Sequence, residues 1–231
     1  MKKRLFIYCE GQTEEMIVER LIRNHLTHHG VKVERPELAA TSLDPAGQRG
    51  GFVNWDAIEF DLRQTFTSDN DQHLRFTTFL DVYAMPAKVL GLAGYSSAIG
   101  TPAEVEAVER AIENTFSEPR FKAYLQRHEL EALLLADLDA LARVFHRDKS
   151  GILTLQQDIA EFSNAEDINH GPSTHPSARL ASAIAGYKNL KASNAYHVLA
   201  EVGIEEGSIV RSKCPRFDAW LKHWESWGAE R

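Results

Sequence analysis

The run from Leu5 to Cys9, LFIYC, constrains the fold of this chain more than any other part of its sequence. The run is apolar throughout rather than alternating, and Arg4 and Glu10 bound it with charge. A strand of this kind must be covered on both faces, which is typical of a parallel sheet. An amphipathic helix follows, with an apolar stripe between Ile17 and Leu26 at helical spacing. Strand, tight turn and helix together predict the opening of a doubly wound α/β domain.

The first helix carries start signals of its own. Thr13 is placed to act as its N-cap. Glu14 and Glu15 then lie in the first turn, where the helix dipole favours carboxylates. Dipole stabilisation is the simpler role for Glu14, and a general base or an outer acceptor at a nearby site is the alternative.

Further strands and helices are expected along the whole chain. Strands are predicted at 31–40, 75–83 and 121–125, and helices at 55–66, 102–113, 129–145, 155–162, 178–184, 198–202 and 218–227. The segment 42–52, with a proline and several glycines, is predicted to be a loop. We expect a single domain over 1–231, with a core at about 1–147 and a helical C-terminal extension at about 148–231.

Composition limits the class of protein. No apolar run approaches the roughly 20 residues that span a bilayer, and the first apolar run is too short for a signal peptide. We therefore expect a cytoplasmic protein without a membrane partner. The net charge of -7 argues against a protein that coats nucleic acid, although the C-terminal part is mildly basic. Cys9 and Cys214 form no disulfide framework and are expected to be inert packing.

An acid lies at the end of each of two predicted core strands. Glu10 directly follows the apolar run of the first strand, and Asp81 ends the apolar stretch of the second. In open α/β sheets the ligand crevice lies outside the carboxyl ends of the strands. Two carboxylates at this edge repel one another unless a cation lies between them, and carboxylate oxygens suit Mg²⁺ or Mn²⁺. The alternative is that each acid simply caps its strand in water.

Five motifs in order carry a resemblance to a known family: EGQTEE, LDVYAMP, HELEALLLAD, NHGPSTHPSARL and CPRFDAWL. As a set they resemble an uncharacterised bacterial family of the Toprim-like group, related to Toprim nucleases of the overcoming-lysogenization-defect (OLD) type. The resemblance implies a Toprim-like α/β fold with a mainly parallel sheet. It also implies that Glu10, Asp81 and either Glu129 or Glu131 hold Mg²⁺ or Mn²⁺.

The activity that the resemblance implies is metal-dependent cleavage of phosphodiester bonds in DNA or RNA. It further implies a separate ABC-type ATPase partner and a role as an effector in anti-phage defence. The chain departs from the Toprim pattern at the second motif, because Asp81 is followed by Val82 and Tyr83 instead of a second aspartate. A catalytically inactive interaction or regulatory subunit is therefore the alternative, and a phosphohydrolase of small phosphate esters is a third. A homo-oligomer is left open.

A basic group is also needed, to offset the charge that grows on phosphoryl oxygens. Arg179 follows the proline-rich loop at a predicted helix start, where Ser177 would be the N-cap, and this pairing is typical of an anion site. The alternative is a plain cap beside a surface cation. A looser basic set, mixed with aromatic residues, could bind nucleic acid, or its aromatic members could be core. This set consists of Lys188, Lys191, Arg211, Lys213 and Arg216, with Tyr187, Tyr196, Phe217 and Trp220.

Histidines and the remaining motifs add little at this stage. His25, His28 and His29 lie at the end of the first helix, where positive charge complements the dipole, an interpretation we prefer to a metal cluster. The sequence contains no Walker-type glycine loop, GxSxG elbow or HExxH pair. Nucleotide hydrolysis, serine esterase chemistry and zinc proteolysis are therefore disfavoured.

Overall fold

The computed structural model describes residues 2–38, 55–83, 85, 87–91, 100–168, 171 and 173–230. The protein is an α/β structure built on a six-stranded sheet. The strands are β1 (Lys3–Cys9), β2 (Val31–Val33), β3 (Glu37–Leu38), β4 (Leu74–Asp81), β5 (Phe121–Lys122) and β6 (Leu125–Gln126). The order is β2-β1-β4-β5, with β3 also on β1 and β6 also on β4. Every strand pair is parallel, as the apolar run of β1 predicts.

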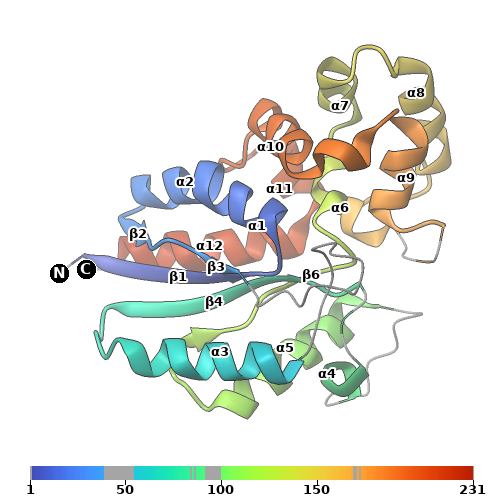
Figure 1. Cartoon of the computed structure of the whole chain (residues 1–231). Coiled ribbons are helices and arrows are strands. Elements are labelled where there is room, and N and C mark those ends of the chain that lie inside the picture. Colours follow the sequence, from blue (N-terminus) through green and yellow to red (C-terminus); the bar gives the residue numbers. More distant parts are fainter. Residues whose placement is uncertain are drawn as a thin grey trace.

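Helices cover both faces of the sheet (Figure 1). One face carries a long helix composed of α1 (Gln12–Ile17), a π-helical turn η1 (Val18–Ile22) and α2 (Arg23–His28). The opposite face carries α3 (Trp55–Ser68) and α5 (Pro102–Phe116). Thr101 caps α5 in a complete capping box with Glu104, and α4 (Ala87–Gly91) lies beside the start of α5. This layering buries β1 and β4 on both sides.

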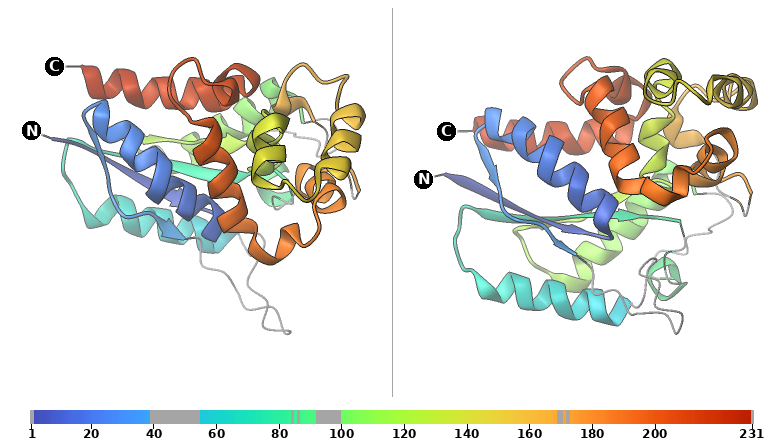
Figure 2. Two further views of the ribbon diagram at one scale, coloured as in Figure 1. Left: turned by 90° about the horizontal axis from the view of Figure 1, so that it is seen from above. Right: turned by 45° about the horizontal axis from the view of Figure 1, so that its top comes forward.

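The remaining helices form the C-terminal region, which is helical as predicted. They are α6 (Glu131–Leu134), α7 (Leu138–Val144), α8 (Lys149–Asp158), η2 (Ala165–Asp167), α9 (Pro176–Ala183), η3 (Tyr187–Leu190), α10 (Lys191–Val202), α11 (Ile209–Lys213) and α12 (Pro215–Ala229). Seen from above, α12 runs alongside the α1–α2 helix (Figure 2). Trp220 of α12 stacks on Tyr124 and Phe79 and donates from Nε1 to Thr77 Oγ1 at 3.1 Å. The last helix is therefore part of the layer that covers the sheet.

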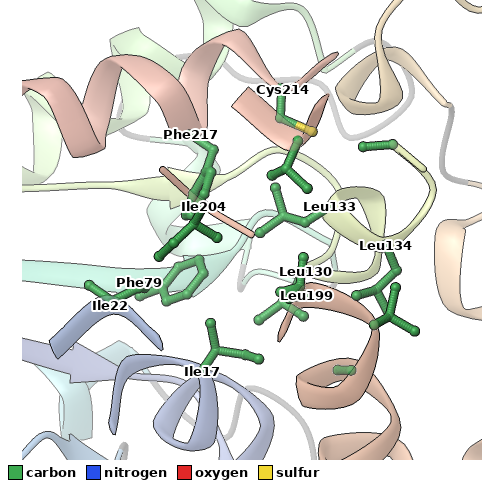
Figure 3. Close-up of a cluster of buried hydrophobic side chains, with 14 of the residues drawn as sticks. Ile17, Ile22, Phe79, Leu130, Leu133, Leu134, Leu199, Ile204, Cys214 and Phe217 are labelled. Atoms are coloured by element: carbon green, nitrogen blue, oxygen red, sulfur yellow. The ribbon is translucent and has the colours of Figure 1, made fainter. Parts of the chain in front are cut away.

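Two hydrophobic cores result, one on each face of the sheet. The core under α3 and α5 contains a cluster of aromatic rings, among them Phe66, Phe76, Phe116 and Phe121. The core on the other face joins β1 and the α1–α2 helix to the C-terminal helices (Figure 3). Cys9 and Cys214 are buried in this second core as free thiols, and burial raises the pKa of both, which disfavours the reactive thiolate.

The most substantial correction concerns the helix predicted at 129–145, which is broken in two. Its leucines fit one apolar stripe, but α6 ends at Leu134 and α7 starts at Leu138. Asp137 causes the restart, because its side chain accepts hydrogen bonds from the amides of Asp139 and Ala140 at 3.0 Å each. The apolar stripe is therefore shared by two short helices.

Other boundaries also differ from the predictions. Thr13 lies inside α1 and Gly11 is the N-cap, because the chain turns directly after β1. The strand predicted at 31–40 is limited to β2 and β3 among the described residues, and the strand at 121–125 is interrupted between β5 and β6. The helix predicted at 155–162 is α8, which starts earlier. The predicted loop at 42–52 lies outside the described residues.

The outer edge of the sheet is closed by carboxylates of α5. Glu113 accepts a hydrogen bond from the amide of Ala123 at 3.0 Å, and Glu109 accepts one from the amide of Leu125 at 2.8 Å. Unpaired edge amides would otherwise be open to pairing with another strand. A cavity of about 690 Å³ lies beside this edge, and Arg216 on its wall pairs with Glu109. Within the described residues, none of the helices is sufficiently long and apolar to cross a membrane.

Candidate functional site

Glu10 and Asp81 meet at the carboxyl edge of the sheet. Because β1 and β4 are parallel neighbours with Cys9 opposite Phe79, the residues that end these strands arrive side by side. Glu10 Oε2 accepts a hydrogen bond from the Asp81 amide at 2.9 Å, and Asp81 Oδ1 accepts one from the Leu130 amide at 2.9 Å. The structure thus brings together the two acids that were placed at this edge from strand ends alone.

Two further acids join them from helix starts. Glu14 lies in the first turn of α1 and is 5% exposed, and Glu131 begins α6 and is fully buried. The start of α6 positions Glu131, because α6 begins immediately after Leu130, whose amide binds Asp81. Four carboxylates from β1, α1, β4 and α6 therefore form one group, which we call the carboxylate cluster: Glu10, Glu14, Asp81 and Glu131.

Burial and mutual repulsion perturb every member of this cluster. Burial, followed by the charge of Glu14, raises the pKa of Glu10 to about 8. Burial and the charge of Glu131 raise the pKa of Glu14 to about 7. Burial and the charges of Glu10 and Glu14 raise the pKa of Asp81, and burial also raises that of Glu131. Such crowding of like charges is typical of sites that bind a cation or move a proton.

One ammonium group faces the cluster. Lys191, the first residue of α10, places Nζ 2.8 Å from Glu131 Oε1, and its side chain is 40% exposed. Among the described residues, no other base forms an ion pair with these four acids. Four carboxylates thus face one ammonium group, and the cluster has more acidic than basic groups.

Glu129, the other candidate for the third carboxylate, is engaged by the start of α9, and its charge also contributes to the raised pKa of Glu131. The oxygens of Glu129 accept hydrogen bonds from the Ser177 amide at 2.8 Å and the Ser177 hydroxyl at 2.9 Å, and His175 Nδ1 lies 3.1 Å away. Glu129 thus occupies the N-terminus of α9, where a free anion was predicted to bind. The N-cap is His175 rather than Ser177, because Pro176 takes the first helical position. Tyr83, two residues after Asp81, stacks on His175 with ring centroids 4.7 Å apart.

Arg179 lies with α8 and α9. Its Nε donates to the Thr174 carbonyl at 2.8 Å, and it lines a cavity of about 390 Å³ together with Asp158 of α8. Gly151 allows these two helices to pack closely, since a Cβ there would lie 2.1 Å from the Ala183 carbonyl oxygen. The structure shows no contact between Arg179 and the carboxylate cluster among its described hydrogen bonds and ion pairs.

The basic set of the C-terminal part is dispersed, and its aromatic members are mostly core. Arg211 is 3% exposed and pairs with Asp218 and Glu225, so it is not available to a phosphate. Lys213 Nζ donates to the Ser163 carbonyl, and Lys188 is exposed. Three of the four aromatic residues are buried: Tyr187, Phe217 and Trp220. The fourth, Tyr196, is half-buried. Only Lys191 reaches the carboxylate cluster.

The donor chemistry of the carboxylate cluster fits a hard dication. Its ligands are carboxylate oxygens, as Mg²⁺ and Mn²⁺ prefer. Among the described residues, no three acids of this cluster are grouped closely enough to coordinate one ion directly together, so the spacing favours an ion that keeps several waters. Mg²⁺ commonly keeps several waters and takes only one or two carboxylates directly.

The fold and this cluster define an α/β protein with an acidic site at the carboxyl edge of a parallel sheet. The chain belongs to a family described as a domain of unknown function (DUF4276), whose model matches residues 9–225. The match includes all four residues of the carboxylate cluster. No curated protein and no solved structure matches the chain.

Sequence reasoning missed two features of this site. The first is Lys191 as the counter-charge of Glu131, since the two residues are 60 positions apart and several helices lie between them. The second is the use of Glu129 to cap α9. A local signal existed for the second, because Ser177 and Pro176 mark a helix start that needs an acceptor for its amides.

Proposed function

We propose that the protein is a divalent-metal-dependent nuclease that cleaves phosphodiester bonds in DNA or RNA with Mg²⁺ or Mn²⁺. The observation that carries this proposal is the convergence of four buried or half-buried carboxylates on one ammonium group at the carboxyl edge of the sheet. Such an excess of buried negative charge is costly without a cation. A bound ion would polarise the phosphoryl group and lower the pKa of a water.

The residues of the cluster divide into distinct roles in this proposal. Glu10 and Asp81 would hold the ion, because hydrogen bonds from backbone amides already fix both carboxylates. Glu131 would hold a second ion or the outer waters. Glu14 would accept a proton from an attacking water, since a pKa of about 7 suits a general base near neutral pH. Lys191, with its half-exposed side chain, would lie against the phosphate oxygens.

The biological setting is proposed from the motif resemblance. A nuclease of this kind would act in the cytoplasm, in anti-phage defence, beside a separate ABC-type ATPase. The negative net charge supports a dependence on a partner that presents the nucleic acid, because the chain offers no broad basic surface of its own in the described C-terminal part.

The test is cleavage of plasmid, single-stranded DNA and tRNA by the purified chain with Mg²⁺ or Mn²⁺. Wild type is compared with the double variant Glu10→Gln, Asp81→Asn, in which the amide oxygens can still accept both backbone hydrogen bonds. Glu15→Gln, in the same helical turn as Glu14, is the matched control. Cleavage by wild type and Glu15→Gln, and its loss in a folded double variant, is the expected result. Cleavage that is equal in all three proteins would show that the cluster is not the site.

A second candidate function is an inactive interaction or regulatory subunit. Two observations favour it: Lys191 neutralises Glu131, and Tyr83 packs on His175 where a second acid would stand. This candidate predicts no cleavage of any substrate and equal shifts in melting temperature with Mn²⁺ for wild type and the double variant. A phosphohydrolase of small esters would instead turn over nucleotides but not polynucleotides.

A further inference from the structure

A second group of metal-binding side chains lies where the end of α2 meets α12, at the opposite end of the first helix from Glu14 (Figure 1). His25 Nε2 lies 2.6 Å from Glu225 Oε1, and the rings of His25 and His29 are 4.8 Å apart. One ligand atom from each of these three residues lies within 4.8 Å of the other two. We propose that His25, His29 and Glu225 form a binding site for Zn²⁺ or a similar transition-metal dication.

The ligand types select this class of ion. Two imidazoles and one carboxylate suit Zn²⁺, whereas Mg²⁺ favours oxygen ligands alone. Tetrahedral coordination with bonds of about 2.0–2.2 Å places ligand atoms about 3.4 Å apart. His25 and Glu225 are closer than this and would separate slightly, and the ring of His29 would close in.

The carboxylate of Glu225 is already oriented. Arg211, whose side chain is 2% exposed, donates to Glu225 Oε1 at 2.6 Å and to Oε2 at 3.1 Å. Ligands whose other atoms are held by hydrogen bonds bind metals more tightly, because less freedom is lost. Asp218 accepts from Arg211 Nε at 2.5 Å and from Lys222 Nζ at 2.7 Å, so it holds the guanidinium in place from its other side. The carboxylate of Glu225 is therefore fixed in the position in which it faces His25.

The backbone on the opposite side of the site is fixed as well. Gly228 lies so close to the end of α2 that a Cβ there would lie 2.0 Å from the His29 carbonyl oxygen. Gly30 then turns the chain away with φ at +83°, a conformation that glycine adopts without strain. Glycine at position 228 thus lets α12 approach α2, which holds His29 opposite Glu225. The site is preorganised from both helices.

A metal ion bound at this site would link the first helix of the chain to the last. His25 and Glu225 are half-buried, whereas His29 is exposed, so a water has access to the fourth coordination position. Because the three ligands come together only in the folded chain, bound metal stabilises the folded state. This inference does not depend on the nuclease proposal, since it uses different residues.

The experiment is calorimetric titration of the full chain with ZnCl₂, in the presence of excess Mg²⁺ to occupy the carboxylate cluster. His29→Gln removes one ligand from an exposed position, so the fold should be kept. His28→Gln is the matched control, because His28 is an exposed histidine on the same turn that contacts the Asn24 carbonyl. The same titrations are repeated in the double variant Glu10→Gln, Asp81→Asn.

We expect one Zn²⁺ per chain in wild type, in His28→Gln and in the double variant, with affinity at least about 10-fold weaker in His29→Gln. Zn²⁺ should raise the melting temperature of the same proteins and leave that of His29→Gln almost unchanged. Equal affinity in wild type and His29→Gln, or no binding to wild type, would overturn the proposal. Loss of Zn²⁺ binding in the double variant would also overturn it, because the ion would then belong to the carboxylate cluster.

Discussion

Substitution of Glu14 by glutamine measures how much the ionised Glu14 carboxylate lowers the free energy of unfolding of the metal-free chain. Glu14 is 5% exposed, and burial together with Glu131 raises its pKa from 4.5 to about 7. Each unit of pKa shift corresponds to about 1.4 kcal/mol. At pH 8 and without metal, the ionised Glu14 should therefore cost about 3 kcal/mol of folding free energy relative to a neutral side chain of the same shape.

The direction of the pH dependence follows from where the proton is held. Between pH 4.5 and about 7 the folded chain keeps a proton on Glu14 that the unfolded chain has already released. The free energy of unfolding of wild type therefore falls as pH rises through this window. Glu14→Gln lacks this contribution, so its advantage over wild type should be near zero at pH 4.5 and grow to about 3 kcal/mol at pH 8.

Urea unfolding with EDTA, at several pH values from 4.5 to 8.5, measures this difference. Glu15→Gln is the control, since it removes one charge from the same turn of α1 outside the cluster. Its difference from wild type at each pH is the baseline for the loss of one charge from this turn, and it is subtracted from the difference measured for Glu14→Gln. A difference between Glu14→Gln and wild type that does not change with pH would refute the reasoning, because it would show that Glu14 is not held protonated by its surroundings.

Four further predictions concern the metal and the packing. Mg²⁺ should raise the wild-type melting temperature more at pH 8 than at pH 5, because carboxylates bind it only after they lose their protons. Thr101→Ala removes the cap of α5 and should lower the free energy of urea unfolding by about 1 kcal/mol. Gly151→Ala places a Cβ 2.1 Å from the Ala183 carbonyl oxygen and should cost about 1–3 kcal/mol in the same assay. Trp220→Phe leaves Thr77 Oγ1 without its buried donor and should cost about 1–3 kcal/mol, with an unchanged far-UV spectrum.

The parts of the site that strand ends determine were predictable. The apolar run before Glu10 and the β-rich segment before Asp81 each specify a buried strand by local pattern. Parallel pairing then places their carboxyl ends at one edge without any further information. The same local logic predicted α3 and α5, whose apolar stripes and cap are continuous in sequence.

The parts that depend on tertiary partners were not predictable from the same patterns. The leucines between 130 and 141 keep helical spacing, so periodicity indicates one helix, while the hydrogen bonds of Asp137 divide it. Lys191 and Arg211 resemble surface cations because their partners Glu131 and Glu225 lie elsewhere in the sequence. A pair of this kind becomes visible only when the two segments are placed in space.

The two proposed metal sites differ in their ligands, and this difference affects every assay in which a metal salt is added to the chain. The helix from α1 to α2 carries Glu14 of an all-oxygen cluster in its first turn and His25 of an imidazole group near its end. Sites with N and O ligands bind Zn²⁺ more tightly than Mn²⁺, and imidazole suits Zn²⁺ whereas Mg²⁺ prefers oxygen, so traces of Zn²⁺ should bind the histidine group even in excess Mg²⁺. A gain in stability measured with Mn²⁺ or Mg²⁺ salts that contain traces of Zn²⁺ would then be the sum of binding at two sites. Because EDTA removes both ions, a chelator alone does not separate them, whereas His29→Gln and Glu10→Gln each remove only one.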